Sequence, residues 1–273
     1  MTDSFSRDSD SRRRPAFLAW RWPAGGPGRR LLTRAGLACV VLAAVALLAW
    51  WSLPAEAPSF ATTISADRGE RKQVTLPDGS VLELNGNALA EVKFYGARRE
   101  VELQGGEILF TVNAEAQRPF IVRAGSADVR AAGAVFDVRR DEDDVTVLVR
   151  AGTADVTGGH WWNLGLAVLR DGHRIRVPAS GAIGVPAPAD VDALLAWQTG
   201  RLVFRDTPMA EVVREMNRYL AAPLRLADSR AGRLRLSASF DLDPPEAMLQ
   251  ALAAAAPVTL APAADGAIDL KAR

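Results

Sequence analysis

The longest hydrophobic stretch of the chain runs from residue 35 to residue 55 and contains no charged side chain. A helix needs about 20 apolar residues to cross the hydrocarbon core of a bilayer. The pattern therefore predicts one transmembrane helix at 35–55, with a tail at 1–34 before it. A buried core helix is one alternative. A cleaved signal peptide is the other, because Ala55-Glu56-Ala57 resembles a cleavage site.

Beyond the predicted helix the pattern changes to short runs in which apolar and polar residues alternate. Residues 54–61 are interpreted as a linker. Pro77-Asp78-Gly79-Ser80 separates two such runs and predicts a tight turn between strands, since Pro presets φ and Gly tolerates positive φ. The strands predicted around and after this turn are 74–76, 81–84, 101–103, 108–112, 120–123, 129–131, 135–138, 145–149 and 154–156. Short, regularly spaced strands without helices favour an all-β domain at 65–180, either a sandwich or a β-roll.

A third pattern begins at residue 190, after a Gly-, Ala- and Pro-rich segment at 178–188 that is typical of a loop. Thr207-Pro208 opens a run with apolar residues at helical spacing as far as Leu220. A second helix is predicted from Pro244 to Ala256. The accompanying predicted strands are 202–204, 224–226, 234–240, 258–260 and 267–270. Mixed helices and strands in this order predict a small α+β domain at 190–273.

Charge gives the predicted helix an orientation. Residues 1–34 carry eight arginines against three aspartates, whereas residues 56–273 carry 25 basic against 29 acidic side chains. Positive charge stays on the cytoplasmic side of a membrane helix, so the N-terminus is predicted to be cytoplasmic and the later domains external. Arg34 at one end, and Trp50 with Trp51 near the other, are predicted membrane anchors because indoles favour the interface.

The remaining composition limits the chemistry. The external part has no clustered basic patch of the kind that nucleic acid requires. Cys39 is the only cysteine, so no disulfide within the chain is expected. His160 and His173 have no Glu or Cys at zinc-ligand spacing. Hydrolase elbows and P-loops are missing from the sequence. We therefore expect no metal site, no cofactor and no enzyme activity.

Several motifs, taken in order, resemble the FecR family of single-span sigma-factor regulators. They are Leu76-Pro77-Asp78-Gly79-Ser80, Gly105-Gly106-Glu107-Ile108-Leu109-Phe110-Thr111-Val112, Pro119-Phe120-Ile121-Val122 and Gly133-Ala134-Val135-Phe136-Asp137-Val138. The last region, with Trp197, Gly200, Leu202, Phe204, Pro208 and Arg218-Tyr219, resembles the family's C-terminal domain. That domain is similar to the short signalling domains of secretins and TonB-dependent receptors. The resemblance covers residues 65–273.

The resemblance implies an anti-sigma factor, or regulator of a sigma factor, in the inner membrane. Its partners would be a cytoplasmic extracytoplasmic-function sigma factor and the signalling domain of a TonB-dependent outer-membrane receptor, in a system linked to iron-siderophore uptake. The family usually has a longer helical, tryptophan-bearing region before the membrane. Trp20 and Trp22 are the predicted remnant of that sigma-binding region, with a plain topology tail as the alternative.

Receptor contact is predicted at the longest alternating strand of the last region, with Leu234, Leu236 and Phe240 as candidates. Strand addition to an exposed edge would supply this contact. An ordinary internal strand is the alternative interpretation. A second function class stays open at this point: a membrane-tethered structural or assembly module that binds secretin-like or cell-wall partners. An envelope enzyme is the third, for which the sequence offers no nucleophile or base.

Overall fold

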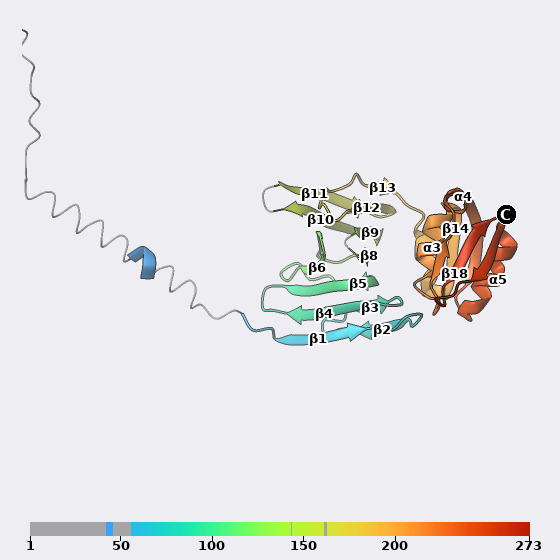
Figure 1. The fold of residues 1–273 in the computed structure, drawn as a ribbon. Helices are drawn as coiled ribbons and strands as arrows, with labels where there is room; N and C mark the ends of the chain where they lie inside the picture. Colours follow the sequence, from blue (N-terminus) through green and yellow to red (C-terminus); the bar gives the residue numbers. More distant parts are fainter. Residues whose placement is uncertain (1–41, 46–55, 143, 161–162) are drawn as a thin grey trace, which may run out of the picture. The chain divides into compact units, whose positions relative to one another are not determined.

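The computed structural model describes residues 42–45, 56–142, 144–160 and 163–273 (Figure 1). The chain divides into two units, 1–55 and 56–273. In the first unit, residues 42–45 are helical, and Leu42 and Val45 are exposed. No helix among the described residues is long and apolar enough to span a membrane. Apart from residues 42–45, the span predicted at 35–55 lies outside the described residues.

The second unit opens with thirteen strands in one curled sheet, called the curled sheet below. They are β1 (Phe60–Ser65), β2 (Lys72–Thr75), β3 (Val81–Leu84), β4 (Leu89–Phe94), β5 (Arg99–Thr111), β6 (Phe120–Ala124), β7 (Ala127–Ala131), β8 (Val135–Asp141), β9 (Asp144–Ala151), β10 (Thr153–His160), β11 (Asn163–Arg170), β12 (His173–Val177) and β13 (Ala187–Pro188). The main path is β11-β10-β7-β6-β5-β8-β9-β12-β13. Two branches, β4 with β1 and β3 with β2, leave it at β5.

Strand β5 joins the two halves of the curled sheet. Its first half pairs with β4 and with β6, and its second half pairs with β3 and β8. The change of partners falls at Gly105 and Gly106, beside a bulge in the β4 pairing. Gly106 has a φ of 85°, and a Cβ there would lie 2.4 Å from the Cα of Ala88. Only glycine fits this bend, because it tolerates positive φ and close approach of another backbone.

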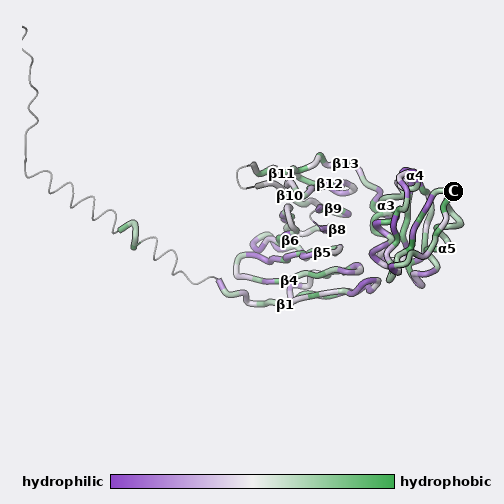
Figure 2. Tube along the Cα trace, in the orientation of Figure 1, coloured by the Kyte–Doolittle hydropathy of each residue, from purple (hydrophilic) through white to green (hydrophobic). Residues whose placement is uncertain are grey.

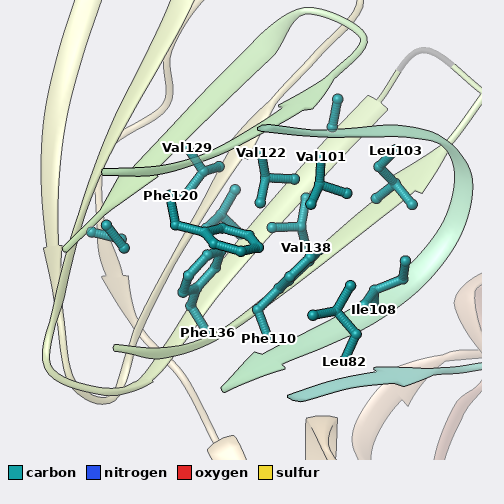
Figure 3. Close-up of a cluster of buried hydrophobic side chains, with 14 of the residues drawn as sticks. Leu82, Val101, Leu103, Ile108, Phe110, Phe120, Val122, Val129, Phe136 and Val138 are labelled. Carbon is teal, nitrogen blue, oxygen red and sulfur yellow. The ribbon is translucent and has the colours of Figure 1, made fainter. Parts of the chain in front are cut away.

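Alternation along the strands buries one face of the curled sheet (Figure 2). Because successive side chains of a strand point to opposite faces, the apolar members meet in one interior. Figure 3 shows part of this first core, where Phe110 stacks on Phe136 with ring centroids 5.2 Å apart and contacts Phe120 edge-on. Each of these three rings is fully buried. The packed rings and their aliphatic neighbours hold the two halves together.

The chain ends in a smaller α+β part at residues 190–273, called the C-terminal module below. Its elements are α2 (Val191–Leu194), η1 (Ala196–Thr199), β14 (Arg201–Pro208), α3 (Met209–Met216), β15 (Leu224–Leu226), α4 (Ser229–Arg233), β16 (Arg235–Asp241), α5 (Pro245–Ala255), β17 (Val258–Pro262) and β18 (Ile268–Ala272). Strands β14 and β16 form one antiparallel sheet, and β15-β18-β17 form another. Helix α3 buries Met209, Val212, Val213 and Met216 on one face, as the helical spacing predicts.

The mainly β fold class is confirmed, as are most predicted strands and both predicted helices. Three differences have physical causes. Strand β1 starts at Phe60, inside the segment interpreted as a linker, because its pairing with β4 makes it part of the curled sheet. The strands predicted at 101–103 and 108–112 are one strand, since Gly105-Gly106 bends it without ending it. Short α4 has little apolar periodicity; Asp228 caps it instead, accepting from the backbone N–H of Ala231.

Candidate functional site

The predicted turn at Pro77–Ser80 is held by a buried ion pair. Asp78 accepts hydrogen bonds from the backbone N–H and the hydroxyl of Ser80, and from the Arg99 guanidinium. Arg99 is fully buried and also donates to the carbonyl oxygens of Asn113 and Arg118. Burial alone raises the pKa of Asp78, but the bonds from Ser80 and Arg99 outweigh it and the pKa lies below its usual value. This motif is structural: it fixes the turn to the start of β5.

The second charged group lies on the opposite side of the sheet from the first core. On strands β5, β8 and β9 the residues that alternate with the core positions form one surface, called the covered face below. It consists of Glu107, Leu109, Asp137, Arg139 and Leu148. In the strand register Asp137 lies between Leu109 and Leu148, and Arg139 lies opposite Glu107. Glu107 and Asp137 are each only 4% exposed, which is unusual for carboxyl groups on the outer side of a sheet.

The C-terminal module covers this face. Leu109 and Leu148 belong to the same buried cluster as Trp197, Phe204 and Met216 of the module, and not to the first core. Gln198 adds a polar contact, its side-chain amide donating to Glu83 at 2.9 Å. The curled sheet therefore has two apolar sides where the module sits, one closed by its own strands and one closed by the module.

Ion pairs cross the same boundary. Arg218 donates to Asp141 at 2.9 Å, and its Nη2 lies 3.5 Å from Glu107. Arg139 contacts both Asp141 and Glu215. Their side chains are mostly shielded from water, so these charges interact more strongly than surface pairs do. The module and the curled sheet are thereby held in one register.

Neutral hydrogen bonds complete the network. The Tyr219 hydroxyl donates to the Asn85 side-chain oxygen at 2.9 Å, and the Asn85 amide donates to Glu107 at 2.7 Å. All three groups are buried. Burial raises the pKa of the Tyr219 phenol, so the hydroxyl stays a donor at physiological pH. Glu107 is thus bonded to Asn85 on one side and faces Arg218 on the other.

The two buried carboxyl groups of the covered face have altered acidity. Loss of hydration raises the pKa of Glu107, although Arg218 opposes the shift. The pKa of Asp137 lies well above its usual value, first because it is buried and second because the charge of Glu107 repels its own. Both shifts come from removing carboxylates from water faster than the nearby guanidinium groups compensate for it.

Hydrogen bonding on this face is incomplete. Among the described residues, no group donates to Asp137 Oδ1 and no group accepts from Trp197 Nε1, although both atoms are buried. Arg218 Nε and Nη2 are buried without a hydrogen-bond acceptor as well; the 3.5 Å contact to Glu107 is an ion pair only. Buried polar atoms nearly always find partners, so their shortage marks a functional surface.

Its chemistry is that of binding and coupling. Within the described residues there is no group of three His, Cys, Asp or Glu side chains that could hold a metal ion. The covered face offers fixed charges, a polar pair and apolar contacts. Such a surface can hold two parts of a protein together and respond when one charge is neutralised.

The residues predicted from the sequence lie elsewhere. Trp20, Trp22, Arg34, Trp50 and Trp51 are outside the described residues, so their roles remain predictions.

The predicted receptor-binding strand lies in β16. Leu236 and Phe240 are buried in the module's core, and Leu234 is half-buried just before the strand. Among the described strands, β16 pairs with β14 alone. Its other edge could offer a partner backbone groups but not these two side chains. The receptor-contact role of the three residues stays a prediction.

The covered face itself was not predicted. Its charged residues occupy outward strand positions, where the sequence pattern predicts solvent. The usable signal is apolar: Leu109 follows Ile108, and Leu148 follows Val147, so each breaks the alternation of its strand. An outward leucine flanked by inward apolar residues indicates that something covers that side of the sheet.

Comparison with known proteins bears on the curled sheet. Residues 62–155, which include the Asp78 turn and the covered-face strands β5, β8 and β9, match the model of the family described as FecR protein. The chain belongs to the FecR family. No curated protein matches it in sequence.

Solved structures extend the likeness of this FecR-family chain beyond the matched segment. Two crystal structures of a proposed anti-sigma factor from Parabacteroides distasonis, at 2.50 and 1.65 Å resolution, are similar to it. Each is 29% identical, with a TM-score of 0.67, over 78% of this chain and 100% or 99% of the solved chain. The share covered is too large for the FecR segment alone, so the similarity includes the C-terminal module.

Proposed function

We propose that this FecR-family protein is an anti-sigma regulator anchored in the cytoplasmic membrane. The observation that carries the proposal is the likeness to a proposed anti-sigma factor over 78% of the chain, together with the family match at residues 62–155. The uncharged segment at 35–55 and the arginine-rich segment before it support an N-terminus in the cytoplasm, where sigma factors act.

The finer proposal concerns the direction of the signal. The C-terminal module docks the signalling domain of a TonB-dependent outer-membrane receptor, in a pathway linked to iron-siderophore uptake. The resemblance of the module to such signalling domains supports this step. The covered face then passes the bound state to the curled sheet, whose first strand begins at Phe60, five residues after the end of the predicted span.

At the cytoplasmic end, residues 1–34 contact an extracytoplasmic-function sigma factor. A short segment of this kind can order itself on a partner, and paired indoles are effective apolar anchors. Trp20 and Trp22 are the side chains proposed for this contact. The regulator needs no catalytic group for any of these steps.

Crosslinking followed by capture from the native host tests the proposal. The full-length chain is compared with a variant lacking residues 1–30, which keeps Arg34 to preserve topology, and captured proteins are identified by mass spectrometry. We expect a sigma factor with the full-length chain alone, and Trp20→Ala with Trp22→Ala should weaken its capture. Recovery of envelope proteins alone, with equal amounts of both variants in the membrane, would instead support a tethered assembly module.

A further inference from the structure

A cavity of about 440 Å³ lies between the curled sheet and the C-terminal module. One wall is the covered face with its neighbours on β9 and β12. The other wall comes from α2, η1, β14 and α3 of the module. The volume is in the range of small-ligand sites, which also tend to lie where two parts of a protein meet. Nothing in the proposed anti-sigma role requires this space.

The apolar part of the lining fits an aliphatic chain. Leu148 and Ile175 line it from the sheet, and Leu194, Trp197 and Phe204 line it from the module. Side chains such as lysine combine an aliphatic stem with a charged end and can bury the stem against such a surface.

The charged part of the lining favours a cation. Six carboxyl groups line the cavity against four guanidinium groups; the carboxyl groups are Glu107, Asp137, Asp141, Asp144, Glu211 and Glu215, and the guanidinium groups are Arg139, Arg174, Arg176 and Arg214. Arg139 is already paired with Asp141 and Glu215, and Arg176 is paired with Asp144. An anion entering the cavity would be repelled by this excess of carboxylates, whereas a cation would be attracted.

Asp137 gives this excess of carboxyl groups a focus. It lines the cavity, is 4% exposed, and receives no hydrogen bond to Oδ1 from any described residue. Glu107 is its diagonal neighbour across the strand pair. The guanidinium groups nearby are committed to Asp141, Glu215 and Glu107. An ammonium group has three donors, so one such group beside Asp137 would satisfy its carboxylate and reduce the repulsion from Glu107.

We propose that this cavity binds an alkylammonium group, the chemistry shared by lysine side chains and aliphatic amines, with Asp137 as the residue that receives the ammonium. The site is distinct from the sigma-factor contact and from the β16 edge. Binding closes the space between the sheet and the module, so the ligand stabilises the docked arrangement of the two.

Trp197 offers a direct readout, because its indole N–H lies in the lining and has no acceptor among the described residues. The full-length chain in detergent micelles is labelled with ¹⁵N-tryptophan, and the Trp197 signal is assigned with Trp197→Phe. Pentylammonium and the peptide acetyl-Gly-Lys-Gly-amide are the two probes. Pentanol and pentanoate, with the same stem but a neutral or negative end, are the controls.

We expect saturable shifts of the Trp197 signal with at least one ammonium probe, and at least about tenfold weaker effects with pentanol and pentanoate. Shifts with both probes identify a site for free amines and peptides alike; shifts with the peptide alone identify a peptide segment as the source. Either supports the proposal. Equal responses to pentanol or pentanoate, or no response to either ammonium probe, overturn it.

Two variants locate the binding group. Asp137→Asn keeps the shape of the side chain and should weaken ammonium binding about tenfold or more. Asp155→Asn, on an exposed position of β10 away from the cavity, should bind as the unmodified chain does. Thr146→Lys places a tethered ammonium in the lining and should block the free probes even where Asp137→Asn fails to fold. Unchanged binding in Asp137→Asn or in Thr146→Lys contradicts the assignment.

Discussion

The two sides of the curled sheet are buried by different chemistry. The first core contains stacked phenylalanine rings and aliphatic side chains, and its strands position every member by simple alternation. The covered face buries two leucines beside Glu107, Asp137 and the arginines that reach across from the module. Apolar burial stabilises without specifying a partner, whereas buried charges are costly unless one particular arrangement pairs them. The comparison indicates that the first core makes the domain and the covered face selects how the module docks.

The largest effect is expected in the first core. Phe136→Ala removes a ring that stacks on Phe110 and should lower the free energy of unfolding by about 4 kcal/mol. Guanidinium unfolding of residues 56–273, followed by circular dichroism, measures the change. A loss below about 1 kcal/mol would mean that the curled sheet repacks freely, against the account of a tightly packed core.

Removing one charge from the covered face comes next. Arg218→Ala leaves Glu107 buried without its cation, and breaking such a pair should cost about 3 kcal/mol. The same denaturation experiment measures it. As a matched control, Arg218→Met combined with Glu107→Gln replaces both charges and should lose clearly less than Arg218→Ala alone. An equal loss in both would show that shape, and not charge, is what the arginine contributes.

Neutralising Asp137 should stabilise the protein. Its native pKa is raised, by burial first and then by Glu107 and Glu215, while Arg139 and Arg218 oppose the shift. The native state therefore holds a proton that the unfolded state releases at lower pH, and stability falls as the pH rises from the unfolded pKa through the native one. Asp137→Asn removes this loss and should gain about 1 to 3 kcal/mol at pH 7.5.

Thermal unfolding of Asp137→Asn and the unmodified chain at several pH values tests that sign. The advantage of the variant should shrink as the pH falls toward 4, near the usual pKa of an aspartate. An advantage that grows on acidification would mean that Asp137 is stabilised as a carboxylate, contrary to its burial.

The smallest effect is expected for an exposed pair of the same chemical kind. Arg225 donates to both oxygens of Asp265 at 2.7 and 2.8 Å, yet both side chains are about half exposed. Water and salt screen such pairs, so Asp265→Asn should leave the melting temperature unchanged within error. A loss comparable to that of Arg218→Ala would remove the distinction between buried and exposed charges on which the comparison rests.

Predictability from the sequence follows the same division. Strand and helix positions such as Phe136, Met209 and Val212 follow from periodicity, because their environment is set by neighbours on the same element. The docking of the module depends on side chains brought together from residues 85, 107, 137 and 218. Their pairing is a tertiary fact that no local pattern encodes. The outward leucines, Leu109 and Leu148, are the one trace of the covered face in the sequence.

The candidate site was correspondingly harder to predict than the fold. The alternating run at 234–240 was correctly interpreted as a strand, but its apolar residues fill the module's own core. Glu107 lies inside a family-like motif where it reads as an ordinary solvent-facing residue between apolar neighbours. Burial of a carboxyl group cannot be deduced until the element that covers it is placed.

Hydrogen exchange measured by mass spectrometry on Arg218→Ala tests most directly whether the buried charges hold the module on the sheet. The account predicts faster exchange in α3 and in the facing strands β5 and β8, while β4, β6 and β7 keep their protection. Asp265→Asn serves as the matched control and should exchange like the unmodified chain. Unchanged exchange in α3, or an equal increase in every strand, would contradict the role of the covered face.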